Sequence, residues 1–192
     1  MRTILVGYWL PLGAGGRSVR LNGRVFEAIS VRLGHGAPCD LYHSALEVWA
    51  EHDRYVIEMA PVWSVRSDDR RAVSEGAVGS GLRMFRYEIR CWHDGRIPHV
   101  GEAVDGPQRM TEDAVIARRV LDLIPDVPTP VWGRDELRTG EMWNSNSVTA
   151  WLPVHSGIDT RLARLPTGGR APGWSARCDS APPHKPISGL YG

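Results

Sequence analysis

Alternating apolar and polar positions predict strands along the first two thirds of the chain. Five segments are rich in β-branched and aromatic residues and are separated by Gly, Pro, Asp or His turns. They are RTILVG from Arg2, RVFEAISVRL at 24–33, HSALEVWA from His43, RYVIEMAPVW from Arg54 and RMFRYEIRCW from Arg83. In the last segment the apolar residues from Phe85 to Cys91 alternate with Arg86, Glu88 and Arg90. This pattern predicts a half-buried antiparallel strand, with Ile89 in the core and Arg86 on the outer face.

The register of one strand pair can also be predicted. A two-residue turn at His52 and Asp53 would place Glu51 opposite Arg54. In that register Glu47 faces Glu58, and such a like-charge pair is unfavourable unless the carboxylates are solvated or protonated. Two alternatives follow: the register is one residue off, or this face of the sheet is wet.

Helical spacing is clearest between Thr111 and Pro125. Thr111 is the expected cap, the next two acidic residues favour the positive end of a helix, and Pro125 ends it. The apolar residues with helical spacing are Ala114, Ala117, Val120, Leu121 and Ile124. The charged, Gly-rich segments at 67–81 and 94–109 predict exposed loops.

These elements predict an α+β fold in which an antiparallel sheet packs against a few helices. A length of 192 residues suits one domain, and we place it at residues 1–165. Residues 166–192 contain many Gly and Pro and few residues that could pack, which predicts a disordered tail.

Composition narrows the partners and the compartment. Lys and Arg number 23 against 22 Asp and Glu, so the chain offers no broad basic field, and nucleic acid is not an expected partner. Three cysteines without CxxC spacing favour a reducing compartment, so we expect a cytoplasmic protein. The apolar run near the N-terminus is interrupted by Pro11 and predicts a first strand instead of a membrane span or secretory signal.

The segment GEMWNSNSVTAWL at 140–152 is the main candidate for chemistry. Asn144 or Ser145 can cap a helix there, and Pro153 is expected to end that helix after about two turns. Capping alone explains the small polar residues in one interpretation. In the other, the helix dipole and nearby backbone N–H groups support an anionic nucleophile.

Two segments carry a family resemblance. NSNSVTAWL, from Asn144, resembles the nucleophile segment of circularly permuted papain-like proteins, which include lecithin retinol acyltransferase-like enzymes and relatives of the NlpC peptidases. YHSALEV, from Tyr42, resembles their histidine strand, and it precedes the nucleophile segment as in permuted members. The resemblance implies an α+β fold and acyl hydrolysis or transfer through a thiol. Ser145 stands where that family has cysteine, and serine is a poor nucleophile without a well-placed base.

Two functional hypotheses follow. In the first, Ser145 is the nucleophile, His43 is the base and backbone N–H groups near Asn146 and Ser147 hold the oxyanion of a small-molecule or peptide acyl substrate. Asn144 and Trp143 would then contribute to binding, Trp143 by lining an apolar groove. In the second, the groove between the His43 strand and the Ser145 helix binds a peptide, lipid or protein partner without catalysis.

The other candidate residues leave the chemistry open or incomplete. The third catalytic residue could be His52, Asp40 or Asn144, and no cofactor is implied. The spacing HxxxCxxxH at His35, Cys39 and His43 lacks a fourth ligand, as does a second set at Cys91, His93 and His99, so no metal site is predicted. The Gly-rich LPLGAGGRS, from Leu10, lacks a phosphate-loop ending and predicts a hairpin loop.

Overall fold

In the part of the chain that the structure describes, six antiparallel strands form one sheet in the order β4-β5-β3-β2-β1-β6. The computed structural model describes residues 3–12, 40–62, 72–77 and 86–175. The strands are β1 Ile4–Pro11, β2 Tyr42–Ala50, β3 Asp53–Val62, β4 Ala72–Ala77, β5 Arg86–His93 and β6 Val104–Thr111. The helices are α2 Ala114–Asp122 and α3 Ser145–His155, with short 3-10 turns η1 Val100–Glu102, η2 Ile124–Asp126 and η3 Thr160–Leu162.

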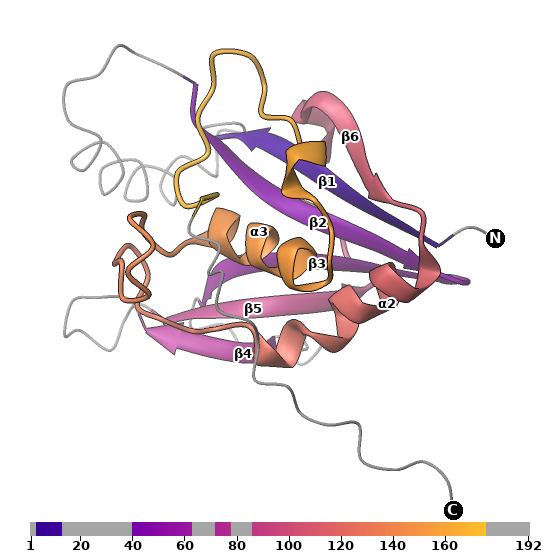
Figure 1. Ribbon diagram of the computed structural model, residues 1–192, viewed down its shortest axis with the longest axis horizontal. Helices are drawn as coiled ribbons and strands as arrows, with labels where there is room; N and C mark the ends of the chain where they lie inside the picture. Colours follow the sequence, from indigo (N-terminus) through magenta and orange to yellow (C-terminus); the bar gives the residue numbers. More distant parts are fainter. Residues whose placement is uncertain (1–2, 13–39, 63–71, 78–85, 176–192) are drawn as a thin grey trace, which may run out of the picture.

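Both α-helices lie across the same face of the sheet (Figure 1). Leu46 and Val48 of β2 and Ile57 of β3 form a buried cluster with residues of α2 and α3, including Val120, Val148 and Leu152. Period-two alternation of apolar residues along β2 and β3 puts these side chains on one face, which the helices cover. The predicted α+β class is therefore confirmed.

The register of β2 and β3 differs from the predicted one. Ala50 pairs with Asp53, so the turn residues are Glu51 and His52, and Glu51 has a φ of 57°. Each β2 residue therefore faces a β3 residue two positions earlier than expected, which preserves the face of every side chain. Glu47 faces Val56, and Glu58 faces Arg90 of β5. The predicted pairing of Glu47 with Glu58 is wrong, because the turn begins one residue earlier.

Two segments predicted as loops contain strands. β4 lies within 67–81. β6 begins within 94–109, continues to Thr111 and pairs with β1 at the edge of the sheet. Gly106 and Pro107 made this segment look like a loop in the sequence. An edge strand tolerates proline, because a residue whose N–H would point away from the sheet needs no hydrogen-bond partner there. The remaining loop residues are not fully exposed either, since Gly95 and Ile97 are buried.

The two helices also differ from prediction at their ends. Asp113, not Thr111, caps α2, because its carboxylate accepts hydrogen bonds from Val115 N (2.8 Å) and Ile116 N (3.1 Å). α3 continues through Pro153 to His155. All of its residues except Ser145 and Val154 are buried, and this burial offsets the roughly 3 kcal/mol that an interior proline costs.

The folded domain extends beyond the predicted boundary at residue 165. Tyr42 N donates to Arg170 O and Arg170 N donates to Asp40 O, both at 2.8 Å. Trp174 is buried, with its ring centroid 4.7 Å from that of Trp9. Residues 166–175 therefore pack against the sheet and do not belong to a tail.

Several predictions concern residues outside the described ranges. They are the strand at 24–33, most of the Gly-rich loop after Leu10, His35, Cys39, the tail at 176–192 and the side chain of Arg86. Within the described part of the chain, no helix is both long and apolar enough to cross a membrane.

Candidate functional site

The polar residues before α3 form a structural junction. Asn144 Oδ1 accepts a hydrogen bond from Asn146 N (2.8 Å), and Asn144 N donates to Ser147 Oγ (3.0 Å), which completes a capping box. The Ser147 hydroxyl also lies 2.9 Å from Gly173 O. The predicted binding residues Asn144 and Ser147 are thus buried and committed to the start of the helix.

Asn146 joins three parts of the fold. Its Nδ2 donates to Tyr42 O of β2 and to Pro172 O, both at 2.9 Å, and its Oδ1 accepts from Ser44 Oγ at 2.8 Å. Asn144 Nδ2 donates to the same Pro172 carbonyl at 2.9 Å. The space between β2 and the start of α3, which the sequence suggested as a groove, is therefore filled by hydrogen-bonded side chains.

Ser145 and His43 do not share a site. Ser145 is the first, partly exposed residue of α3, whereas His43 neighbours Ser44, whose side chain faces that helix. Alternation along the strand puts His43 on the other face of the sheet. There burial, together with the nearby His99, lowers the pKa of His43 to about 4.

The remaining parts of the predicted site are also engaged elsewhere. The backbone N–H of Asn146 bonds to Asn144 Oδ1, and that of Ser147 bonds to Asn144 O at 3.0 Å, so neither is available for an oxyanion in this structure. Trp143 is 1% exposed and belongs to the core, so it lines no groove. His52 and Asp40, two candidates for the third residue, are exposed, and neither hydrogen-bonds to Ser145 or His43 among the described residues.

A groove of about 770 Å³ lies on the opposite side of the sheet from α2 and α3. This side, here called the far face, carries Tyr8, Glu47, Arg54, Glu88 and Arg90. The connection between β5 and β6 forms the wall of the groove. The lining residues are Tyr8, Glu47, Arg54, Arg96, Ile97, Pro98, His99, Val100 and Gly101.

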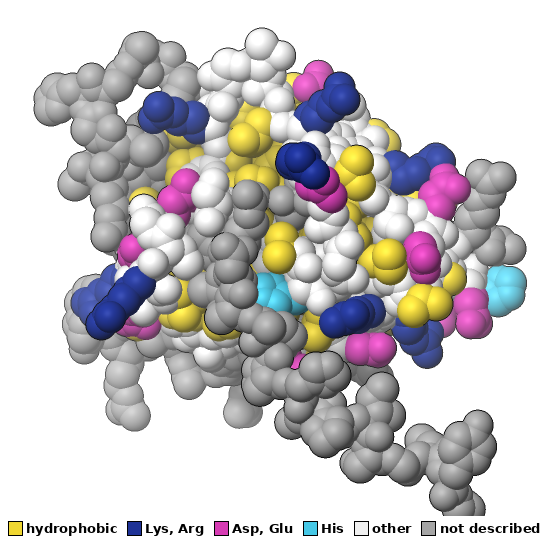
Figure 2. Space-filling model, viewed as in Figure 1, with side chains coloured by type: hydrophobic (Ala, Val, Ile, Leu, Met, Phe, Trp, Pro, Cys, Tyr) yellow, Lys and Arg dark blue, Asp and Glu magenta, His cyan; other side chains and the backbone are white. Residues whose placement is uncertain are grey.

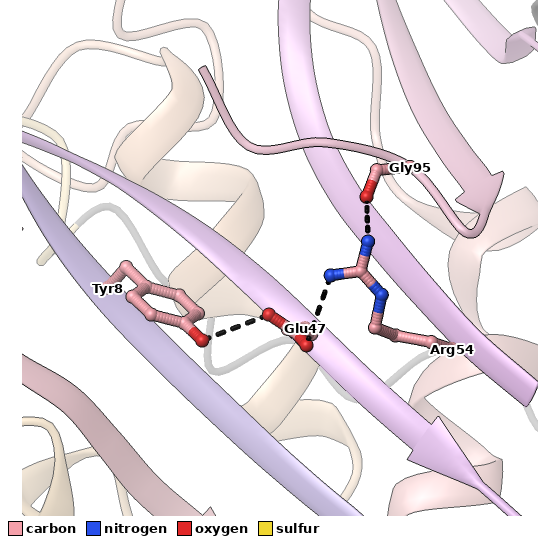
Figure 3. Close-up of polar contacts among 4 residues, drawn as sticks. All are labelled: Tyr8, Glu47, Arg54 and Gly95. Carbon is pink, nitrogen blue, oxygen red and sulfur yellow. Dashed lines mark hydrogen bonds and ion pairs between the residues drawn. The ribbon is translucent and has the colours of Figure 1, made fainter. Parts of the chain in front are cut away.

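Glu47 is the buried charge at this groove. It is 6% exposed and lies between Tyr8 of β1 and Arg54 of β3 (Figure 3). Tyr8 Oη donates to Glu47 Oε2 at 2.9 Å, Arg54 Nη1 lies 3.4 Å from Glu47 Oε1, and Arg54 Nη2 donates to Gly95 O. Arg54 thus connects the buried carboxylate to the wall of the groove.

The phenol of Tyr8 is a hydrogen-bond donor at neutral pH. Burial raises the pKa of Tyr8 to about 12, and its hydrogen bond to Glu47 and the charge of Glu47 act in the same direction, while Arg54 acts against them. The protonated phenol and the guanidinium each donate a hydrogen bond to one oxygen of the Glu47 carboxylate.

A second charged cluster lies on the same face. Arg90 is 6% exposed, its Nε donates to Glu88, and its Nη1 lies 3.8 Å from Glu58 Oε1. Its guanidinium carbon lies 5.3 Å from the centroid of the Trp92 ring. β5 is therefore not half-buried as predicted, since Glu88 and Arg90 are buried as well as Tyr87 and Ile89.

The described residues do not bring together three potential metal ligands of the His, Cys, Asp or Glu type. Burial raises the pKa of Cys91 to about 11, which disfavours its metal-binding thiolate form. On the helix-covered side, basic and acidic side chains are interspersed (Figure 2).

No protein-family model, curated protein or solved structure matches the chain. The chain is an α+β domain whose helices cover one face of a six-stranded sheet. Its candidate site is the charged groove on the far face. The predicted base His43 lies on this face, whereas Tyr8, Glu47 and Arg54 were not predicted as a group. The sequence feature that indicated this site was the predicted placement of Glu47 and Glu58 on the same face of two paired strands. Charged residues at such positions can be buried when the sheet is covered on that face.

Proposed function

We propose that this protein is a binding module whose ligand occupies the groove on the far face. The observation that carries the proposal is a cavity of about 770 Å³ with the buried Glu47 carboxylate in its lining. Small-molecule sites commonly have volumes of roughly 300–1,000 Å³ and combine an apolar lining with a few placed polar groups. Ile97, Pro98 and Val100 supply the apolar part here.

The energetics of Glu47 and Arg54 support a binding role. Removing two charges from water costs several kcal/mol per ion, and their attraction commonly repays little more than that. Replacement of a buried ion pair by well-packed apolar residues is often neutral or stabilising. A buried carboxylate held by a phenol and a guanidinium is better explained by recognition of a polar ligand than by stability.

A blocking variant tests this proposal. An added Cβ at Gly101 would meet no atom within 4 Å, so Gly101→Trp fits the backbone and places a large ring in the groove. Ala114→Trp adds the same ring at an exposed position on α2 and is the matched control. Saturation-transfer NMR with a fragment mixture should give signals for the unchanged chain and for Ala114→Trp that Gly101→Trp lacks. Signals that persist in Gly101→Trp, or no signals in any form, would refute the proposal.

Acyl transfer at Ser145 stays a prediction from the sequence. Its specific support is the position of Ser145 at the helix N-terminus with a partly exposed side chain. Labelling by a fluorophosphonate probe that is lost in Ser145→Ala would establish an activated serine. Labelling that also falls in His43→Ala, with the fold intact, would require a rearrangement that brings His43 to the helix side.

A further inference from the structure

We infer that the ligand of the far-face groove is a small organic monocarboxylate with an apolar body, and that Arg96 binds its carboxylate. The inference rests on the proposed function and specifies its ligand. Three features of the groove support it: the balance of charge in the lining, the availability of Arg96, and the apolar residues beside it.

Among the lining residues that the structure describes, arginines outnumber carboxylates. The arginines are Arg54 and Arg96, and the carboxylate is Glu47. Glu47 is already compensated by Arg54 at 3.4 Å and by the Tyr8 hydroxyl at 2.9 Å. A ligand with one negative charge therefore complements the groove, whereas a cation would meet an unbalanced guanidinium.

Arg96 is the group that remains for the ligand. It is exposed, and among the described residues its guanidinium has no ion pair or hydrogen bond. Arg54 is not equivalent, because its two terminal nitrogens are used by Glu47 and by the Gly95 carbonyl. A free guanidinium presents a planar pair of N–H donors that matches the two oxygens of a carboxylate.

Apolar residues next to Arg96 select the rest of the ligand. Ile97 is buried, and Val100 is 44% exposed, one of the most exposed large hydrophobic residues in the described chain. Both line the groove together with Pro98. An aryl or branched alkyl group would remove this surface from water, at roughly 25 cal/mol for each Å² buried.

The wall that carries these residues is anchored at its base. Arg54 donates to Gly95 O, and Asp94 N donates to Arg54 O at 2.7 Å. Gly95 lies so close to the sheet that an added Cβ would be 2.7 Å from Trp92 Cβ. The backbone of Arg96 and Ile97 directly follows this anchor, which limits how far this part of the wall can move relative to Glu47 and favours a preorganised site.

Calorimetry with matched probes tests the inference. 4-Phenylbutyrate and its neutral analogue 4-phenylbutanamide would be titrated at pH 8 into the full chain, Arg96→Glu and Arg118→Glu. Arg118 is exposed on α2, across the sheet from the groove, so its substitution is the charge-matched control. We expect the acid to bind about tenfold or more tightly than the amide, because a charge-assisted pair is lost in the amide.

The variants separate the possible outcomes. Arg96→Glu should weaken binding of the acid by about tenfold or more and leave the amide nearly unchanged, while Arg118→Glu changes neither by more than about twofold. Equal binding of acid and amide, no binding of the acid while other fragments bind, or an acid affinity unchanged in Arg96→Glu would overturn the inference. The proposed function would survive these results if Gly101→Trp still blocked fragment binding. If no fragment depended on the groove, both would fail.

Discussion

Replacing Asn146 by alanine tests whether the polar residues before α3 are structural. The side chain donates to Tyr42 O and Pro172 O at 2.9 Å and accepts from Ser44 Oγ at 2.8 Å; the first and third bonds are buried and the bond to Pro172 is partly buried. A typical intramolecular hydrogen bond contributes a net of about 0.5–1.5 kcal/mol, so three contribute about 1.5–4.5 kcal/mol.

The groups that lose their hydrogen bond to Asn146 narrow this range of the expected destabilisation. Pro172 O keeps its bond from Asn144 Nδ2, and Ser44 Oγ keeps Thr149 Oγ1. The Tyr42 carbonyl loses its side-chain donor, and an unsatisfied buried group costs about 1–3 kcal/mol. We therefore expect Asn146→Ala to lower the free energy of unfolding by about 2–4 kcal/mol.

The neighbouring serine provides the control. The side chain of Ser145 makes no hydrogen bond within the described ranges, so Ser145→Ala should change the free energy of unfolding by less than about 0.5 kcal/mol. Urea melts with unchanged m-values would measure both variants. A loss below about 1 kcal/mol for Asn146→Ala, or equal losses for the two, would refute the structural interpretation.

Three further predictions concern the sheet. Ile89 is fully buried, so Ile89→Ala should cost about 2–5 kcal/mol in a denaturant melt, and a loss below about 1 kcal/mol would place it outside the core. At Gly95 an added Cβ would lie 2.7 Å from Trp92 Cβ and 3.1 Å from Val56 Cβ. Gly95→Ala should therefore destabilise the protein by about 1–3 kcal/mol, and a melt identical to that of the unchanged chain would contradict this packing. Burial lowers the pKa of His43 to about 4 in the folded chain, whereas in the unfolded chain this pKa is about 6.5. At a pH between these two values the unfolded chain therefore binds a proton at His43 that the folded chain does not bind. Stability should fall as pH falls from 7 to 5, by more for the unchanged chain than for His43→Gln; equal losses in urea melts would show that His43 is not buried as described.

The sequence predicts β1, β2, β3 and β5, whose apolar and aromatic residues on one face contribute to the core that the helices cover. It does not predict β4 and β6, which occupy the two edges of the sheet. An edge strand needs fewer core residues, so its pattern is weak, and pairing with a distant strand decides its conformation.

The candidate site was harder to predict because its contacts are remote in sequence. The spacing of Asn144 and Ser147 correctly indicates a helix cap, which depends on neighbours in the chain. The partners of Asn146, in contrast, lie 104 and 26 residues away. Nothing local distinguishes an asparagine that ties a helix to a sheet from one that binds a substrate. Likewise, only the side on which α3 packs decides whether His43 or Ser44 faces that helix.

The pairing of charges on the far face distinguishes two registers of β2 and β3 that the apolar pattern leaves equivalent. A turn at His52 and Asp53 and a turn at Glu51 and His52 place every side chain of β2 and β3 on the same faces, so apolar facing cannot distinguish them. The first turn opposes Glu47 to Glu58. The second opposes Glu47 to Val56 and brings it within 3.4 Å of Arg54. Because Glu47 is buried, a carboxylate opposite Glu58 would be costly, and of the two alternatives that the like-charge pair left open the structure shows the shifted register. Glu47 and Arg54, whose pairing distinguishes the two registers, also line the proposed groove.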